Sequence, residues 1–360
     1  MRDSKPNSLL VGDNARRADV NQAWEQDNQA WWDWYVTLAE NGPPSTARDV
    51  DALRAVDLEQ VLLAESSQPP DEVILNELAT PFALHPDAVA SFQRNGFVKL
   101  RNVLSRAAVS RLRCEMVRLL EAQFDIKMNG GTRERFLSME MVWLENLLIR
   151  AFVLSTRIAG ICAALLDVPR VRLYHDNLLS KEPGCGRTPW HYDDHHFPLA
   201  TQQVVTAWIP AQPIPRSMGP LTFAAPIESW QLVRDIEFSK FDTSYDRQVS
   251  ESFRKHRVAI DDSPFALGEV SFHHNLSFHT AGANHTDISR LVLANTYYVD
   301  GARVVNQPTM VSGDWQKFIR DTAPGAVAAS PLNPVCWPAD ASKTAAIGGQ
   351  PLPRNSELEQ

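Results

Sequence analysis

The pattern of apolar and polar positions changes character near Pro169 of this 360-residue chain. Before that point apolar residues recur at helical spacing, with helix start and stop signals around them. After it, short apolar runs bounded by Gly, Pro, Asn or Asp are typical of strands. The pattern therefore predicts a mainly helical first part followed by a β-rich part.

Five segments of the first part have helical periodicity, and the predicted helices cover 21–38, 46–65, 86–94, 105–122 and, as one or two helices, 139–166. A short strand is predicted over 97–100, after the helix-breaking pair Asn95-Gly96. In the first helix, Trp24, Trp31, Tyr35 and Leu38 share one face. We interpret that face as docking on the main domain, and a ligand-binding role for the tryptophans is the alternative.

The predicted strands of the second part cover 171–180, 204–210, 221–225, 258–260, 269–272 and 291–299. Strands without intervening helices of crossover length favour an antiparallel barrel or jelly roll over a doubly wound sheet. The charged stretch 233–257 interrupts them and is interpreted as a lid insertion. Three regions follow: a helical N-terminal extension (1–84), a β-rich domain (85–306) and a C-terminal wrapping or partly disordered tail (307–360).

The composition of the chain limits the kinds of partner that it can bind. The net charge is −8 and the pI is near 5.7, so the chain has no overall positive field to hold a nucleic-acid polymer. Its four cysteines form no CxxC pair, and we found no signal peptide and no apolar run of about 18 residues. We therefore expect a cytoplasmic protein without a membrane partner; the oligomeric state is not predicted.

The candidate chemistry lies in the segment WHYDDHHFP at 190–198. Side chains two apart on an extended backbone point to the same face, so His191 and Asp193 can reach one metal ion together. A second histidine group, His273, His274 and His279, follows downstream. Two imidazoles and one carboxylate make the facial triad of non-haem Fe(II) oxygenases, which leaves coordination positions open.

Several histidines compete for these roles. His273 and His274 compete with His279, which we favour because Arg290 follows it by eleven residues, where a guanidinium could pair with a carboxylate. The pair His285 and Asp287 has the same HxD spacing, but no histidine follows to complete it. Two further histidines adjoin the motif and are interpreted as substrate-facing groups or neighbours of the ligands: His195 and His196.

Four ordered motifs resemble the phytanoyl-CoA dioxygenase-like (PhyH) family of Fe(II)/2-oxoglutarate-dependent oxygenases over roughly residues 85–300. They are FQRNGFVKLRNVL at 92–104, WHYDDHHFP at 190–198, TAW at 206–208 followed by GPL at 219–221, and GEV at 268–270 leading to His279 and Arg290. The resemblance implies an α+β fold with a double-stranded β-helix (jelly-roll, cupin-like) core, flanking helices and the helical N-terminal extension. It also implies Fe(II), 2-oxoglutarate and O2 as cofactor and co-substrates.

At the positions that match the family's motifs, the resemblance implies that the metal ligands are His191, Asp193 and His279. Residues assigned to 2-oxoglutarate are Arg290, Trp208, Asn177 and Thr286. One departure is Ala281, where the family often has a small hydroxyl residue; Thr280 or Thr286 could supply the missing hydrogen bond.

The expected activity is hydroxylation of a small molecule, with release of succinate and CO2. Asp193 favours this over halogenation, because its carboxylate occupies the place that a halide would need. Arg187 and Arg216, with Lys181, raise the hypothesis of an anionic substrate, and the Trp-rich N-terminal extension suggests biosynthetic chemistry. The alternatives are desaturation, cyclisation or epimerisation at the same iron, and a non-catalytic cupin-like metal-binding or sensor protein.

Overall fold

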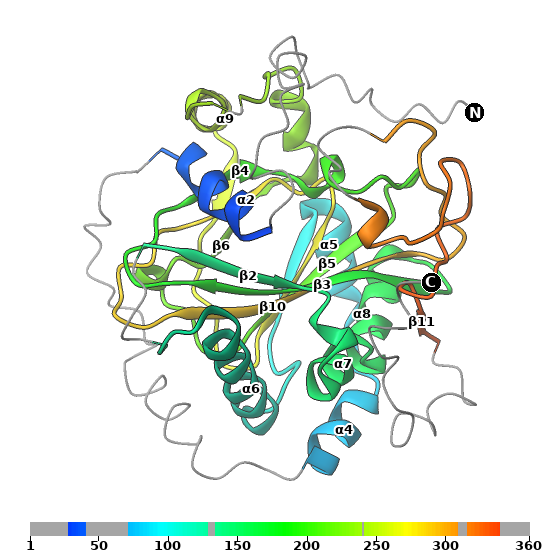
Figure 1. Cartoon of the computed structure of the whole chain (residues 1–360). Helices are drawn as coiled ribbons and strands as arrows, with labels where there is room; N and C mark the ends of the chain where they lie inside the picture. The colour runs from blue at the N-terminus through cyan, green and yellow to red at the C-terminus, as the bar shows by residue number, and fades with distance from the viewer. Residues whose placement is uncertain (1–27, 41–70, 129–133, 240, 309–314, 339–360) are drawn as a thin grey trace.

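The computed structural model describes residues 28–40, 71–128, 134–239, 241–308 and 315–338, and its strands form two antiparallel sheets (Figure 1). The large sheet has the order β1 (Phe97–Leu100), β8 (Val270–His274), β5 (Val204–Pro210), β10 (Arg290–Val299), β3 (Val171–Lys181) and β11 (Val335–Trp337), and β2 (Phe136–Glu140) also pairs with β3. The small sheet has the order β4 (Thr188–His191), β9 (His279–Ala281), β6 (Leu221–Ala225) and β7 (Ala259–Asp261). The predicted α+β class with a double-stranded β-helix core is confirmed.

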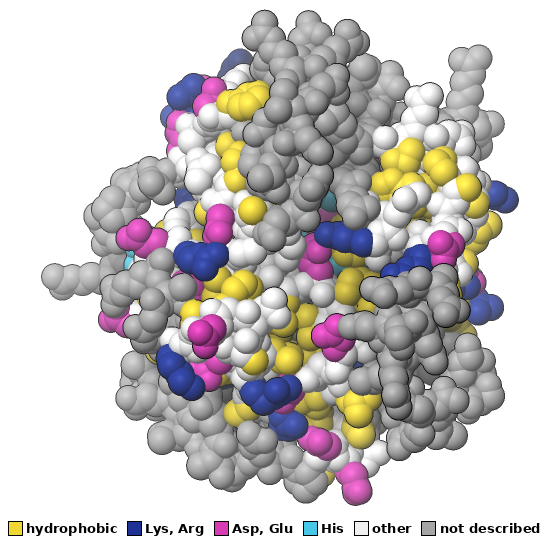
Figure 2. All heavy atoms as spheres, in the orientation of Figure 1, with side chains coloured by type: hydrophobic (Ala, Val, Ile, Leu, Met, Phe, Trp, Pro, Cys, Tyr) yellow, Lys and Arg dark blue, Asp and Glu magenta, His cyan; other side chains and the backbone are white. Residues whose placement is uncertain are grey.

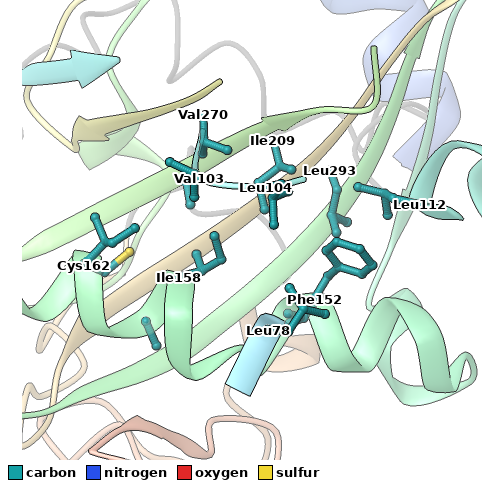
Figure 3. Close-up of a cluster of buried hydrophobic side chains, with 14 of the residues drawn as sticks. Leu78, Val103, Leu104, Leu112, Phe152, Ile158, Cys162, Ile209, Val270 and Leu293 are labelled. Carbon is teal, nitrogen blue, oxygen red and sulfur yellow. The ribbon is translucent and has the colours of Figure 1, made fainter. Parts of the chain in front are cut away.

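Helices cover the outer face of the large sheet and enclose the main hydrophobic core (Figures 1 and 3). They are α4 (Asp71–Ala79), α5 (Pro86–Asn95), α6 (Arg106–Phe124), α7 (Leu147–Val153) and α8 (Thr156–Leu166). Ser105 caps α6 as predicted, its hydroxyl accepting from the amide of Ala108 at 3.1 Å. By length and composition alone the stretch Leu147–Leu166 could span a membrane, but Phe152, Ile158 and Cys162 within it pack in this core.

Strand alternation assigns each residue of the large sheet to one of two faces. Val205, Ala207 and Ile209 of β5 pack under the helices, whereas Thr206 and Trp208 face the interior between the sheets. The same alternation puts the even-numbered residues 290, 292 and 294 of β10 on the inner face. Both faces of the large sheet are buried, so burial does not distinguish them. The inner face is distinguished by its polar residues, such as Thr206 and Arg290.

Residues 28–40 of the N-terminal extension pack against β2 and β4. Helix α2 (Asn28–Tyr35) and the 3₁₀ turn η2 (Val36–Leu38) confirm the helix predicted there, whereas Trp24 and the helix predicted over 46–65 lie outside the described residues. Gln29 bonds the exposed edge of β2 as a neighbouring strand would: its Nε2 donates to Phe136 O at 2.7 Å and its Oε1 accepts from Ser138 N at 3.1 Å. Helix α2 is thereby held against the sheet.

The helix predicted from residue 139 is wrong at its start, because Met139 and Glu140 belong to β2 and helix begins only at α7. Between them lies η4 (Val142–Leu144). Pairing with β3 decides the conformation of this segment, and that tertiary contact is invisible to local periodicity.

Two other segments contribute to the walls of the barrel. The charged stretch contains α9 (Ser244–His256), which packs its apolar face against β4 through Trp190 and Phe253, and it is preceded by η7 (Ile227–Leu232). In the C-terminal region, η9 (Trp315–Lys317) and β11 wrap the large sheet, while the residues from 339 lie outside the description. Two further 3₁₀ turns lie near the site: η5 (Asp193–His195) and η6 (Arg216–Met218).

Candidate metal centre

Two histidines meet across the small sheet. His191 ends β4, His279 begins β9, and they are cross-strand partners with ring centroids 4.1 Å apart. Each turns its Nδ1 to a backbone carbonyl, that of Pro189 at 2.8 Å and that of Ser277 at 2.9 Å. Because a carbonyl only accepts, each Nδ1 carries the proton and each Nε2 keeps its lone pair for a metal.

Asp193 supplies the third donor from η5, just beyond β4. Its Oδ1 lies 3.9 Å from Nε2 of His191 and 3.6 Å from Nε2 of His279, and the donor atoms of the three residues lie within 4.8 Å of one another. This is the only such group among the described residues. Two nitrogens and one carboxylate oxygen, with open positions left, fit ferrous iron better than a closed structural zinc site.

The charge states suit a metal. Burial lowers the pKa of His191, and burial with the neighbouring His191 lowers the pKa of His279 well below its ordinary value. Burial alone would raise the pKa of Asp193, but His279, His273 and His191 outweigh it and hold that pKa well below its ordinary value. Neutral imidazoles and an ionised carboxylate are the forms that bind iron.

The other oxygen of Asp193 is held by residues that sequence reasoning did not assign. His273 of β8 places Nε2 3.3 Å from Oδ2, and the Thr206 hydroxyl donates to the same oxygen at 3.3 Å. His273 is therefore beside the triad without belonging to it. His274 points to the other face of β8, where its Nδ1 accepts from Leu276 N and its ring lies near Phe92.

Arg290 begins β10 and lines the same cavity as the triad. Its Nη1 donates to Gly219 O at 2.5 Å, its Nε is buried without a hydrogen-bond partner, and its guanidinium lies 5.4 Å from the Trp208 ring and 5.9 Å from the Phe136 ring. Burial lowers its pKa to about 10, so it stays charged at neutral pH. No described carboxylate pairs with it, and such a buried cation fits an acidic ligand.

Strand β4 contributes a hydroxyl to the cavity that Arg290 also lines. Thr188 is the cross-strand partner of Ala281, lines the cavity, and accepts from Ala281 N at 2.9 Å, so its own proton remains for a ligand. Neither expected donor lines the cavity: Thr280 donates to Thr188 O, and Thr286 donates to the Asn284 side chain. Thr188 thus offers a hydroxyl to the cavity from the strand paired with Ala281, a placement that the linear sequence could not show.

The predicted residues for 2-oxoglutarate and substrate divide into two groups. Trp208, Asn177 and His196 line the cavity together with the triad and Arg290. Arg187 instead pairs with Asp246 at 3.1 Å, and Arg216 lies 3.4 Å from Asp262, so neither lines it. The side chain of His195 lies outside the description.

The cavity measures about 290 Å³, and its lining includes residues of α2 and of the segment at η9. On the face drawn in Figure 2, small areas of histidine are visible near the centre beside acidic and basic side chains, and charged and hydrophobic groups are spread over the rest of the face. The outer part of the cavity is lined by aromatic residues from α2 and from the C-terminal region. From the sequence, docking was the favoured interpretation of the α2 face and ligand binding by its tryptophans the alternative, whereas the C-terminal region was predicted only to wrap the domain or to be partly disordered. The spacing of Trp31 and Tyr35 was the available signal.

Comparison with known proteins identifies the family of the chain. The model of the phytanoyl-CoA dioxygenase (PhyH) family matches residues 92–292, more than half of the chain. The chain belongs to the PhyH family. It is 25% identical over 243 residues to the peroxisomal phytanoyl-CoA dioxygenase of Bos taurus, an alignment that covers 58% of this chain and 68% of that protein.

Solved structures share the fold of this PhyH-family protein. One is a non-haem α-ketoglutarate-dependent carbocyclase, SnoK, from nogalamycin biosynthesis (TM-score 0.57, 22% identity, 71% of this chain and 99% of that chain). Another is the epimerase SnoN in complex with Fe3+, α-ketoglutarate and nogalamycin RO (TM-score 0.56, 23% identity, 69% and 97%). A third is EctD from S. alaskensis with bound Fe (TM-score 0.52, 16% identity, 71% and 93%).

The family and the site geometry agree. The protein is a non-haem iron enzyme dependent on 2-oxoglutarate, and the predicted family and cofactors are confirmed. A non-catalytic metal-binding role has no use for a buried arginine without a counter-ion in the same cavity.

Proposed function

We propose that this protein hydroxylates a small molecule with consumption of 2-oxoglutarate and O2 and release of succinate and CO2. His191, Asp193 and His279 would hold the iron, and Arg290 would bind the far carboxylate of 2-oxoglutarate. The observation that carries the proposal is the presence of all four groups in one cavity of about 290 Å³. That volume is near the lower end of small-molecule sites, which are roughly 300–1,000 Å³.

Bound iron, with 2-oxoglutarate and O2, supplies the oxidation of a substrate C–H bond, and the protein supplies position and shielding. The Nδ1 protons of His191 and His279 stay on backbone carbonyls, so both rings keep one orientation. Arg290 and Thr188 orient the co-substrate by a charge-assisted pair and a hydroxyl donor. Trp208 covers the guanidinium and excludes water from this charge pair.

Hydroxylation is favoured over halogenation because Asp193 retains a carboxylate beside the two histidines. The carbocyclase and epimerase among the structural neighbours share only the fold with this chain, so they do not favour cyclisation or epimerisation here. The structure also withdraws support from an anionic substrate, since Arg187 and Arg216 do not line the cavity.

The test is succinate formation from 2-oxoglutarate by the full chain with Fe(II) and ascorbate, under air and under nitrogen. We expect O2-dependent succinate, loss of at least about 100-fold in Asp193→Ala and His279→Ala, and retained activity in His285→Ala, the equivalent change at the unused HxD pair. Equal succinate from wild type and Asp193→Ala would overturn the proposal. Mass analysis of a turned-over substrate then distinguishes hydroxylation, a gain of one oxygen, from desaturation, cyclisation or epimerisation.

A further inference from the structure

The outer cavity contains an aromatic surface that belongs to α2. Trp31 and Tyr35 stack with ring centroids 4.5 Å apart and an interplanar angle of 16°. Tyr35 also stands edge-on to His191 at 5.7 Å, and Trp31 stands edge-on to His196 at 5.9 Å. A substrate that touches this surface is therefore adjacent to a proposed iron ligand.

A second aromatic group lines the same cavity from other parts of the chain. His175 of β3 stacks on Phe318 with centroids 4.5 Å apart, and Phe197, which follows η5, stands edge-on to His175 at 6.4 Å. Phe318, like α2, lies outside residues 92–292 that match the family. The iron and co-substrate groups lie inside that range, whereas the outer cavity combines His175 and Phe197 from inside it with α2 and Phe318 from outside it.

The charges of the outer cavity are already neutralised. Lys317 lies 2.7 Å from Glu140, and both line the cavity. The other cation among the described lining residues is Arg290, which the proposed function uses for 2-oxoglutarate. An anionic substrate would have to break the Lys317–Glu140 pair, whereas an uncharged one leaves it intact.

The position of α2 is fixed at both ends. Gln29 and Asn28 bond β2, and beyond the helix Glu40 N donates to Asp246 at 2.9 Å while Glu40 O accepts from Arg187 at 2.8 Å. Arg187 thus holds the extension across the site. The rings of Trp31 and Tyr35 are preorganised, which lowers the entropy cost of binding a flat partner.

Resting on the proposed function, we propose that α2, through Trp31, selects the substrate, and that this substrate is an uncharged molecule presenting a flat aromatic or conjugated ring. The aromatic rings that line the outer cavity can pack against such a ring in the stacked or edge-on geometry that aromatic pairs prefer. A saturated ring of the same carbon skeleton is thicker and lacks the π-face.

Three ligands test this proposal: 2-naphthol, its anionic analogue 2-naphthoate and its saturated analogue decahydro-2-naphthol. Their dissociation constants are measured by calorimetry on the full chain, without metal and again with Fe(II) and 2-oxoglutarate under nitrogen. We expect 2-naphthol to bind at least about fivefold more tightly than decahydro-2-naphthol, as one aromatic pair contributes roughly 0.5–1.5 kcal/mol. We expect it to bind more tightly than 2-naphthoate as well, because Lys317 in the outer cavity is already paired with Glu140. Equal binding of the saturated analogue, tighter binding of the anion, or no binding of any of the three overturns the proposal.

The matched variants are Trp31→Ala and Trp34→Ala, since Trp34 lies in the same helix but does not line the cavity. Trp31→Ala should weaken 2-naphthol about five- to tenfold, Trp31→Phe should retain most affinity, and Trp34→Ala should change it less than twofold. Equal losses in the two alanine variants would reduce Trp31 to a structural role and contradict the proposal. Succinate formed without substrate, measured in parallel, reports separately on the proposed function.

Discussion

His273 holds its Nε2 3.3 Å from Oδ2 of Asp193, the oxygen that does not face His191 and His279. Since Thr206 bonds the same oxygen, the carboxylate has one oxygen for a metal and one for its supports. Outer partners of metal-bound carboxylates set ligand orientation, and their loss commonly costs 10–100-fold in metal affinity.

We therefore expect His273→Phe to weaken metal binding by roughly 10- to 100-fold while leaving the three ligands in place. Titration with Fe(II) under nitrogen, or with Co(II) followed by its absorption, measures this affinity. The control is His274→Phe, because His274 lies on the other face of β8. Unchanged affinity in His273→Phe would show that Thr206 suffices to orient Asp193.

Arg290 and Thr188 should both act on the affinity for 2-oxoglutarate. Hydrogen bonds to charged groups contribute about 1.5–3 kcal/mol, so Arg290→Lys should raise KM for 2-oxoglutarate roughly 10- to 100-fold by losing the two-pronged contact. Removing one neutral hydroxyl in Thr188→Val should raise it only about three- to tenfold.

Thr286→Val is the matched control for this pair of variants, because the Thr286 hydroxyl bonds Asn284 and does not line the cavity. Initial rates of succinate formation at varied 2-oxoglutarate give the KM values. A Thr286→Val effect equal to that of Thr188→Val would argue against a direct contact by Thr188.

The buried carboxyl of Asp176 predicts a pH dependence of stability. Burial raises its pKa from 3.8 to about 7; its Oδ2 accepts from Val142 N, whereas Oδ1 has no hydrogen-bond partner among the described residues. Between these pH values the folded chain keeps a proton that the unfolded chain releases. The free energy of unfolding therefore falls as pH rises from about 4 to 7, by as much as about 4 kcal/mol from this group.

Asp176→Asn removes the titratable carboxyl group at this position. The difference in unfolding free energy, wild type minus variant, should decrease steadily from pH 4 to pH 7 and then level off. Urea unfolding at several pH values measures it. A difference that stays constant across this range would mean that Asp176 is ionised in the folded protein.

The hydrogen bonds of Gln29 to β2 should stabilise helix α2 against local unfolding. Gln29→Ala removes two hydrogen bonds to the edge of β2, each contributing about 0.5–1.5 kcal/mol. Amide hydrogens of α2 should exchange roughly 5- to 100-fold faster, as seen by mass spectrometry, while those of α6 stay unchanged. Gln248→Ala, in which an exposed glutamine bonding within α9 is lost, is the control and should leave α2 as in wild type.

Much of this arrangement could be predicted because short-range patterns encode it. The HxD spacing placed His191 and Asp193 on one face, and Arg290 at the head of a strand pointed to His279 as their partner. The family and the β-helix class followed from ordered motifs. These features depend on neighbouring residues or on their order along the chain.

What the sequence did not show depends on contacts between distant segments. The predicted strand 269–272 stopped one residue before His273, so the alternation that puts residues 271 and 273 on the inner face was not extended. Thr188 became relevant only through its register with Ala281, and β2 exists only as a partner of β3. Docking on β2 and lining of the cavity also proved compatible in α2, where Gln29 does the first and Trp31 and Tyr35 do the second.

Residues 28–40 and the stretch around Phe318 line the outer part of a cavity whose metal-binding residues come from the middle of the chain. We therefore expect oxidising chemistry and molecular selectivity to be separable in this architecture: exchanging residues 28–40 or the stretch around Phe318 with those of relatives would redirect which molecule is oxidised while the iron ligands stay untouched.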